Sequence, residues 1–337
     1  MPRITQALVA IAVVLSFTPP ASAQYLPENA SFWWMNTDDG ITHYVVEVGD
    51  DPDPARTFIV LHGGYGAEHS YLINMVLPLS DDFRFVLYDQ RGSLRTPAPD
   101  STLTFENFIG DLDTLREELG LEKVNLIGHS NGANIVLDYL GTHPDRTNGV
   151  ILIGAPISFV HTDAFDVEDG FADVIQRYSA EVAAHERAAT EQIEAMQKEL
   201  GLLDQEVLSD REVSFRRRVE WAGRHTASAA NWRTAQSAFF NPRVIEHLQN
   251  NVSPEAWRAR TLRKSTAFVN ATVPIRVILG EVDYVDPKGI AWGALMEHTP
   301  DGRLTILEGA GHHPWVDRAD AFTQALRADL EELAGGG

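Results

Sequence analysis

The chain has 337 residues, no cysteine and a formal net charge of −21. Nucleic acids and anionic membrane surfaces both bind clustered Lys and Arg, so the acidic excess argues against either partner, and we interpret it as a solubility feature. Without cysteine the chain can form no disulfide and lacks the attachment site of a lipoprotein anchor.

The first 23 residues have the pattern of a secretory signal peptide. Arg3 gives a short positive start, residues 7–17 form an apolar core, and residues 21–23 are a small-residue cleavage pattern. An N-terminal membrane anchor is the alternative, but the apolar stretch is short for a span and two prolines break it. We therefore expect cleavage after Ala23 and a periplasmic or secreted protein with no integral membrane segment after signal removal.

Short apolar runs alternate with helical patterns along the rest of the chain. The runs are mostly apolar on both faces, which suits parallel strands buried between helices; they cover residues 41–49, 56–64, 83–92, 123–130, 149–156, 274–283 and 303–311. Helices are expected at residues 104–120, 131–141, 287–297 and 319–334. This alternation predicts a doubly wound α/β fold, a mostly parallel twisted sheet with helices on both faces.

Residues 158–272 interrupt the alternation. They contain no convincing strand and are rich in Ala, Glu and Arg at helical spacing. Because the segment lies between two sheet strands, we expect an inserted helical cap over the C-terminal edge of the sheet, where ligands bind in open α/β sheets. The predicted organisation is a core domain of residues 24–157 and 273–337 with a cap of residues 158–272.

The stretch LIGHSNGA places Ser130 between two glycines, after a predicted strand and before a predicted helix. A serine on such a sharp turn adopts strained backbone angles, and glycines two residues before and after it relieve the crowding. The hydroxyl then stands above the sheet at a helix N-terminus. The alternative is a simple glycine-rich turn, but the flanking strand and helix favour a nucleophile.

A serine nucleophile needs a base, and the base needs an acid that orients it. This fold supplies them in the chain order serine, acid, histidine. His312 follows the last predicted strand and is the expected base, ahead of its neighbour His313. GEVDYVDP offers Asp283 and Asp286 as the acid, and Asp283 is preferred because it lies three residues after the strand-ending glycine.

The developing oxyanion needs hydrogen-bond donors. HGGYG (residues 62–66) follows the first apolar parallel run, and its glycines allow backbone N–H groups to approach a substrate. The backbone N–H groups of Gly64 and of Asn131, the residue after the serine, are the expected donors. An ordinary turn is the alternative for HGGYG.

From about residue 40 to residue 330 the chain resembles the α/β-hydrolase superfamily. LHGGYG, YDQRGS, GHSNG, GEVD and GAGHHPW are most similar to the proline iminopeptidase group, of which HGG-x-G together with DQRG is a fairly specific signature. The resemblance implies the α/β-hydrolase fold, a helical cap at residues 158–272 and release of N-terminal residues, often proline, from peptides. It also implies a triad of Ser130, Asp283 and His312, with Gly64 and Asn131 in the oxyanion hole.

Two features depart from the family pattern. The family often has Trp or another large residue directly before the nucleophile. Here that residue is His129, and a histidine at this position is similar to many esterases and lactonases. Family peptidases hold the substrate amine with cap glutamates, and the nearest stretch here, QSAFFN, would replace one of them by Gln236. An amide cannot pair with ammonium as a carboxylate does. Glu220 is the candidate that could compensate, and Tyr65, Glu220 and Gln236 are the expected substrate-binding residues.

The sequence thus predicts an exported serine hydrolase that acts through an acyl-enzyme. An aminopeptidase is slightly favoured, and a carboxylesterase or lactonase is the alternative. A non-catalytic binding protein of the same fold is the third hypothesis. The expected ligand is a small molecule or a short peptide. The sequence has no metal-ligand spacing, dinucleotide fingerprint or P-loop, so we expect no metal and no cofactor; it leaves the oligomeric state open.

Overall fold

The computed structural model describes residues 26–161, 164–165, 171–203, 208–235 and 239–335. The predicted signal peptide and Gln236 lie outside these residues. Among the described residues, no helix is both long and apolar enough to span a bilayer.

One twisted sheet organises the described chain, with strand order β1-β2-β4-β3-β5-β6-β7-β8. The first two pairings, β1 with β2 and β2 with β4, are antiparallel, and the others are parallel. The strands are β1 (Ala30–Asn36), β2 (Thr42–Val48), β3 (Thr57–Leu61), β4 (Arg84–Tyr88), β5 (Val124–His129), β6 (Thr147–Ile153), β7 (Ile275–Gly280) and β8 (Gly302–Leu307).

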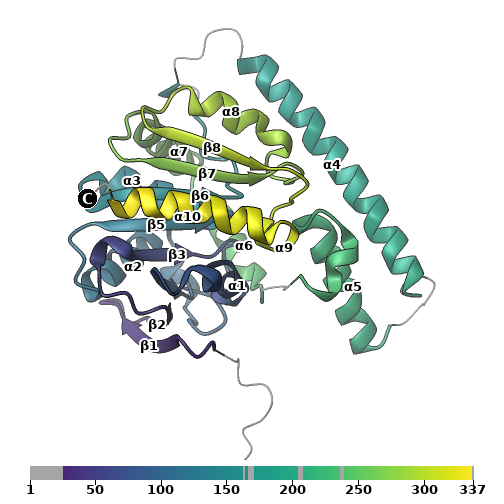
Figure 1. Ribbon diagram of the computed structural model, residues 1–337, viewed down its shortest axis with the longest axis horizontal. Coiled ribbons are helices and arrows are strands. Elements are labelled where there is room, and N and C mark those ends of the chain that lie inside the picture. Colours follow the sequence, from purple (N-terminus) through teal and green to yellow (C-terminus); the bar gives the residue numbers. More distant parts are fainter. Residues whose placement is uncertain (1–25, 162–163, 166–170, 204–207, 236–238, 336–337) are drawn as a thin grey trace, which may run out of the picture.

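Helices cover both faces of the sheet (Figure 1). One face packs against α1 (Ile73–Val76), α9 (Pro314–Asp317) and α10 (Ala319–Gly335). The other packs against α2 (Phe105–Glu118), α3 (Asn131–Thr142), α7 (Pro254–Val269) and α8 (Ile290–Met296). Every residue of β3 and β5 is buried, as expected of strands covered on both sides. The predicted α/β-hydrolase fold class is confirmed.

α2 illustrates how the sequence encodes a covering helix. The Thr104 side chain accepts a hydrogen bond from the backbone N–H of Asn107, which satisfies one of the free donors of the first turn. Its buried apolar residues recur at helical spacing on one side of the helix; they are Phe105, Phe108, Ile109, Leu112 and Leu115.

The first strand was not predicted from the sequence. β1 is an edge strand that leaves Phe32 and Trp34 about half exposed. Its aromatic residues do not alternate with polar ones along the sequence. The exposed rings of Phe32 and Trp34 both contact Tyr44 of β2 instead of facing only solvent. The period of two that identifies a half-buried strand is therefore missing.

Between β6 and β7 the described residues form helices joined by loops and contain no strand. They form α4 (Phe171–Glu199), α5 (Asp210–His225), the short 3-10 helix η7 (Ala229–Arg233), α6 (Pro242–Asn251) and α7. α4 and α5 lie beyond one side of the sheet in Figure 1 and share a small apolar core with η7, centred on Val219 and Ala222. α7 packs on α3 instead. The division into a core and a cap at residues 158–272 stays a prediction.

Candidate active site

Ser130 has an unusual backbone at the junction of β5 and α3. Its φ of 53° and ψ of −124° lie outside the regions that non-glycine residues ordinarily adopt. The flanking glycines make the turn possible: a Cβ at Gly128 would lie 2.6 Å from the backbone of Ala133, and one at Gly132 would collide with the Leu61 carbonyl oxygen. The sequence pattern and the observed strain therefore describe the same feature, a serine presented at the start of a helix.

His312 and Asp283 form a buried pair next to this serine. Nδ1 of His312 lies 2.9 Å from Oδ1 of Asp283, which also accepts a hydrogen bond from the backbone N–H of Val285 at 3.0 Å. The carboxylate accepts the Nδ1 proton, so Nε2 keeps its lone pair and can act as a base. Gly154 makes room for the pair, because a Cβ there would lie 2.8 Å from His312 Nδ1.

Asp286, the alternative acid, has a different role in the structure. Its carboxylate oxygens accept hydrogen bonds from the backbone N–H groups of Ala291 and Trp292 at 3.1 and 2.8 Å, at the start of α8. Burial raises its pKa to about 6, although these hydrogen bonds act in the opposite direction. The structure thus brings Asp283 to the histidine, and Asp286 to a helix N-terminus.

The loop after β3 lies against the serine. Gly64 has a φ of +62°, which favours glycine, and a Cβ at Gly63 would lie 2.6 Å from the Cβ of Ser130. Gly64 and Asn131 both line the cavity at the serine. Within the described residues, neither backbone N–H has a hydrogen-bond acceptor. Both N–H groups are thus free to bind an oxyanion.

A hydrogen-bonded chain fixes this loop to the serine turn. The N–H of Gly63 donates to the Tyr71 hydroxyl at 2.7 Å, and that hydroxyl lies 2.7 Å from Nδ1 of His129. Nε2 of His129 lies 3.2 Å from the carbonyl oxygen of His312, which can only accept. The His129 proton is therefore on Nε2, and Nδ1 accepts from Tyr71. Burial, reinforced by the neighbouring His312, lowers the pKa of His129 well below its usual range, so the ring is neutral.

The cavity above Ser130 has a volume of about 270 Å³, and its described lining residues include no Lys or Arg. Four imidazoles and four other aromatic rings contribute to it, together with Ala67 and the glycine loop; the rings belong to His129, His225, His312, His313, Tyr71, Trp221, Phe240 and Tyr284. No carboxylate is among the described lining residues. Asp283 is completely buried and faces His312.

The structure brings neither Tyr65 nor Glu220, two of the expected substrate-binding residues, to this cavity. Tyr65 is buried and its hydroxyl accepts a hydrogen bond from Arg260 at 3.1 Å, so it helps to hold α7. The Glu220 side chain is about 44% exposed, and its carboxylate lies near Arg216 of α5 and Gln197 of α4. Neither residue lines the cavity, and Gln236 falls outside the described part of the chain.

Several cavity residues were missed by sequence reasoning, Tyr284 and His225 among them. Tyr284 directly follows Asp283, and its ring lines the cavity with its centroid 4.6 Å from that of His312. Its adjacency to the acid was the signal that could have identified it. His225, at the end of α5, gave no local signal, because only the packing of α5 on the loop after β8 brings it to the site.

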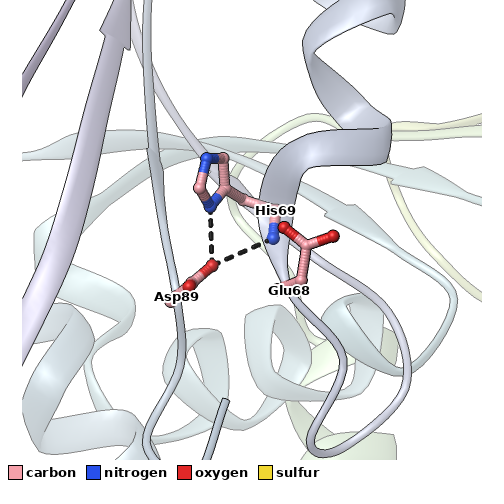
Figure 2. Close-up of side chains that lie close together, drawn as sticks. All are labelled: Glu68, His69 and Asp89. Carbon is pink, nitrogen blue, oxygen red and sulfur yellow. Dashed lines mark hydrogen bonds and ion pairs between the residues drawn. The ribbon is translucent and has the colours of Figure 1, made fainter. Parts of the chain in front are cut away.

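Glu68, His69 and Asp89 form a second cluster of acidic and imidazole groups (Figure 2), and none of the three lines the cavity. His69 Nδ1 is 2.6 Å from Oδ1 of Asp89, and the Glu68 carboxylate accepts hydrogen bonds from the backbone N–H and hydroxyl of Ser70. The Arg95 guanidinium lies 3.4 Å from Glu68 and 3.6 Å from Asp89. Because a cation of the chain already serves both carboxylates, we interpret the cluster as a structural ion-pair network rather than a metal centre.

The electrostatics of that cluster agree with this interpretation. Burial raises the pKa of Asp89, but the His69 hydrogen bond and the nearby imidazoles outweigh burial and hold the pKa below its usual value. The carboxylate is therefore ionised and hydrogen-bonded, and it ties the DQRG segment to the loop that carries His69.

Comparison with known proteins shows to which family the chain belongs. A profile described as "alpha/beta hydrolase fold" matches residues 56–319. The chain is 29% identical over 312 residues to a proline iminopeptidase of Neisseria meningitidis, covering 85% of this chain and 92% of the relative. It is 26% identical over 267 residues to the AB hydrolase superfamily protein YclE of Bacillus subtilis, and this match covers 75% of this chain and 85% of YclE.

Solved structures show the same fold at low sequence identity. A proline iminopeptidase of Mycobacterium smegmatis superposes with a TM-score of 0.59 at 18% identity, covering 90% of this chain and 99% of the other. An esterase of Exiguobacterium antarcticum gives a TM-score of 0.54 at 21% identity, covering 88% and 98%. The resemblance to proline iminopeptidases that the sequence motifs indicated is confirmed, alongside a structural likeness to an esterase.

Proposed function

Because the chain belongs to the α/β-hydrolase fold family, we propose that it is a serine hydrolase with Ser130 as nucleophile, His312 as general base and acid, and Asp283 as the group that orients His312. The observation that carries the proposal is the strained, glycine-flanked serine beside the buried His312–Asp283 pair. The N–H groups of Gly64 and Asn131 would bind the oxyanion.

In this mechanism the Ser130 hydroxyl oxygen attacks the substrate carbonyl while His312 Nε2 takes its proton. The tetrahedral oxyanion forms against the two backbone donors, and its collapse returns the proton from His312 to the leaving group. Water then attacks the acyl-enzyme with the same base, which releases the acid and restores the serine.

Among acyl substrates, we propose that neutral carboxylic esters or lactones fit the cavity best. A protonated α-amine in a buried site needs a carboxylate partner, because an unpaired ammonium is costly to desolvate. The described lining offers none, and Glu220 lies outside it. An aminopeptidase is the second candidate, and its support is the 29% identity to the Neisseria enzyme over most of both chains.

A substrate panel tests these proposals. Short-chain p-nitrophenyl esters and lactones should be hydrolysed, and prolyl or alanyl p-nitroanilides should react no faster with a free amine than when N-acetylated. Ser130→Ala should lower ester turnover by about 10³-fold or more while the protein stays folded. Turnover by this variant within tenfold of wild type would remove Ser130 from the mechanism.

The aminopeptidase candidate has a distinct signature and a matched control. A strong preference for free-amine p-nitroanilides over the N-acetyl compounds would replace the ester proposal with the peptidase one. Glu220→Gln should leave every rate in the panel unchanged, because that carboxylate faces Arg216 rather than the cavity.

A further inference from the structure

His225 brings a second imidazole to the nucleophile cavity. It is the last residue of α5, and its ring stacks on Trp221 with the centroids 4.1 Å apart and the planes inclined by 17°. The ring centroids of His312 and Tyr284 lie 5.6 and 5.5 Å away. His225 is therefore a wall of the cavity next to the expected base, contributed by a helix from the segment between β6 and β7.

The protonation of this ring can be worked out from its contacts. Nδ1 lies 3.0 Å from the carbonyl oxygen of Trp221, and since a carbonyl only accepts, Nδ1 carries the proton. Burial lowers the pKa of His225 to about 3, helped by the neighbouring His312, so the ring is neutral near pH 7. Nε2 then holds a lone pair. It has no partner among the described residues and is not sealed from the cavity.

The ring is also held firmly relative to His312. The carbonyl oxygen of His225 accepts a hydrogen bond from the backbone N–H of His313 at 2.7 Å. Asp317 bridges the same two segments, because its Oδ2 accepts from the N–H groups of Gly311 and Ala227 at 2.8 and 2.9 Å. An acceptor on such a pre-organised wall can discriminate between ligands without first being ordered.

The position of His225 indicates which part of a substrate it meets. In the proposed mechanism the oxyanion points to Gly64 and Asn131, while the leaving group takes its proton from His312. His225 packs against His312, so it faces the leaving-group side. Among the described residues, the cavity lining has no carboxylate to pair with a cationic donor, which leaves a neutral hydroxyl as the suitable partner.

We propose that Nε2 of His225 accepts a hydrogen bond from a hydroxyl group on the leaving alcohol, so that the preferred substrates are monoesters of diols or polyols. This inference rests on the proposed ester hydrolase function. An apolar leaving group of the same size would leave Nε2 of His225 buried without a hydrogen-bond partner. The site should therefore discriminate against esters whose leaving group lacks the hydroxyl.

Two isosteric esters provide the test. We expect 2-hydroxyethyl butanoate to be hydrolysed with a kcat/KM roughly 10-fold higher than that of n-propyl butanoate, the scale of one unsatisfied buried hydrogen-bonding group. In His225→Phe, which keeps a ring on Trp221 but has no acceptor, the ratio should fall to about 1. His225→Gln, whose side-chain oxygen can replace Nε2, should retain part of the preference.

The outcomes separate the two proposals. If neither ester is hydrolysed faster than by Ser130→Ala, the ester hydrolase function fails. If wild type hydrolyses both at equal rates, or if His225→Phe keeps the full ratio, the hydroxyl-binding role of His225 is overturned while the hydrolase function stands. Equal wild-type rates overturn the role even if the Phe variant does not fold. A preference seen only for a hydroxyl on the acyl part would overturn the placement on the leaving-group side.

Discussion

At the scale of single residues, Asp283 and Asp286 show how position separates two carboxylates three residues apart. Both are fully buried, but only Asp283 contacts His312, whereas Asp286 accepts backbone hydrogen bonds at the start of α8. The first would fix the tautomer and orientation of the base, and the second stabilises a helix N-terminus.

We therefore expect Asp283→Asn to lower kcat by about 10³- to 10⁴-fold, because an amide no longer selects the Nδ1-protonated form of His312. Asp286→Asn should stay within about tenfold of wild-type kcat and should instead lower the midpoint of urea unfolding. Steady-state kinetics and urea titration of both variants check this. A larger kcat loss in Asp286→Asn would show that the acid has been assigned to the wrong residue.

At the scale of elements, the contact between α5 with η7 and the loop after β8 connects the inserted helices to the candidate base. Asp317 is the centre of this contact: besides the N–H groups of Gly311 and Ala227, it accepts a hydrogen bond from the Asn231 side chain at 2.8 Å. Removing it would leave three donors without their acceptor, each with a cost of about 1 kcal/mol or more.

Asp317→Ala should accordingly lower kcat by about 10- to 100-fold with a smaller change in KM, and it should lower the Tm, because the loop that carries His312 loses its attachment. Asp320→Ala is the matched control, since this exposed residue lies in the first turn of α10 and has no contact with the site. A Asp317→Ala protein with wild-type kcat and Tm would contradict the coupling between these elements.

The elements also show what the sequence can and cannot predict. The sequence identified the strands that precede Ser130, Asp283 and His312. Buried parallel strands are continuous apolar runs with turn residues at their ends, and this pattern can be recognised in a sequence. The edge strand β1 was missed because Phe32 and Trp34 rest on Tyr44 instead of alternating with polar residues. The cavity wall formed by α5 depends on tertiary contacts that no local pattern encodes. The sequence analysis therefore selected Glu220 of α5 as a substrate-binding residue and overlooked His225 on the same helix.

At the scale of the whole molecule, the family match covers residues 56–319, and the first 23 residues lie ahead of the described structure. That segment has the positive start, apolar core and small-residue ending of a signal peptide. Export stays a prediction of the sequence, because residues 1–25 lie outside the described structure.

Protein recovered from its native host should therefore begin at or near Gln24 and fractionate with exported proteins. N-terminal sequencing or intact-mass measurement checks this. A mature protein that retains Met1 would refute the signal-peptide prediction without affecting the candidate active site.

The neutral imidazoles of the cavity have a consequence for the end of the catalytic cycle. Burial holds the pKa of His129 and His313 well below the usual range and lowers that of His225 to about 3, so these rings gain no positive charge as the medium is acidified from pH 7 to pH 5. A carboxylate released by ester hydrolysis then meets no Lys or Arg among the described lining residues and has the buried Asp283 behind His312. The acid should leave readily, and inhibition by the carboxylate product should stay weak across that pH interval.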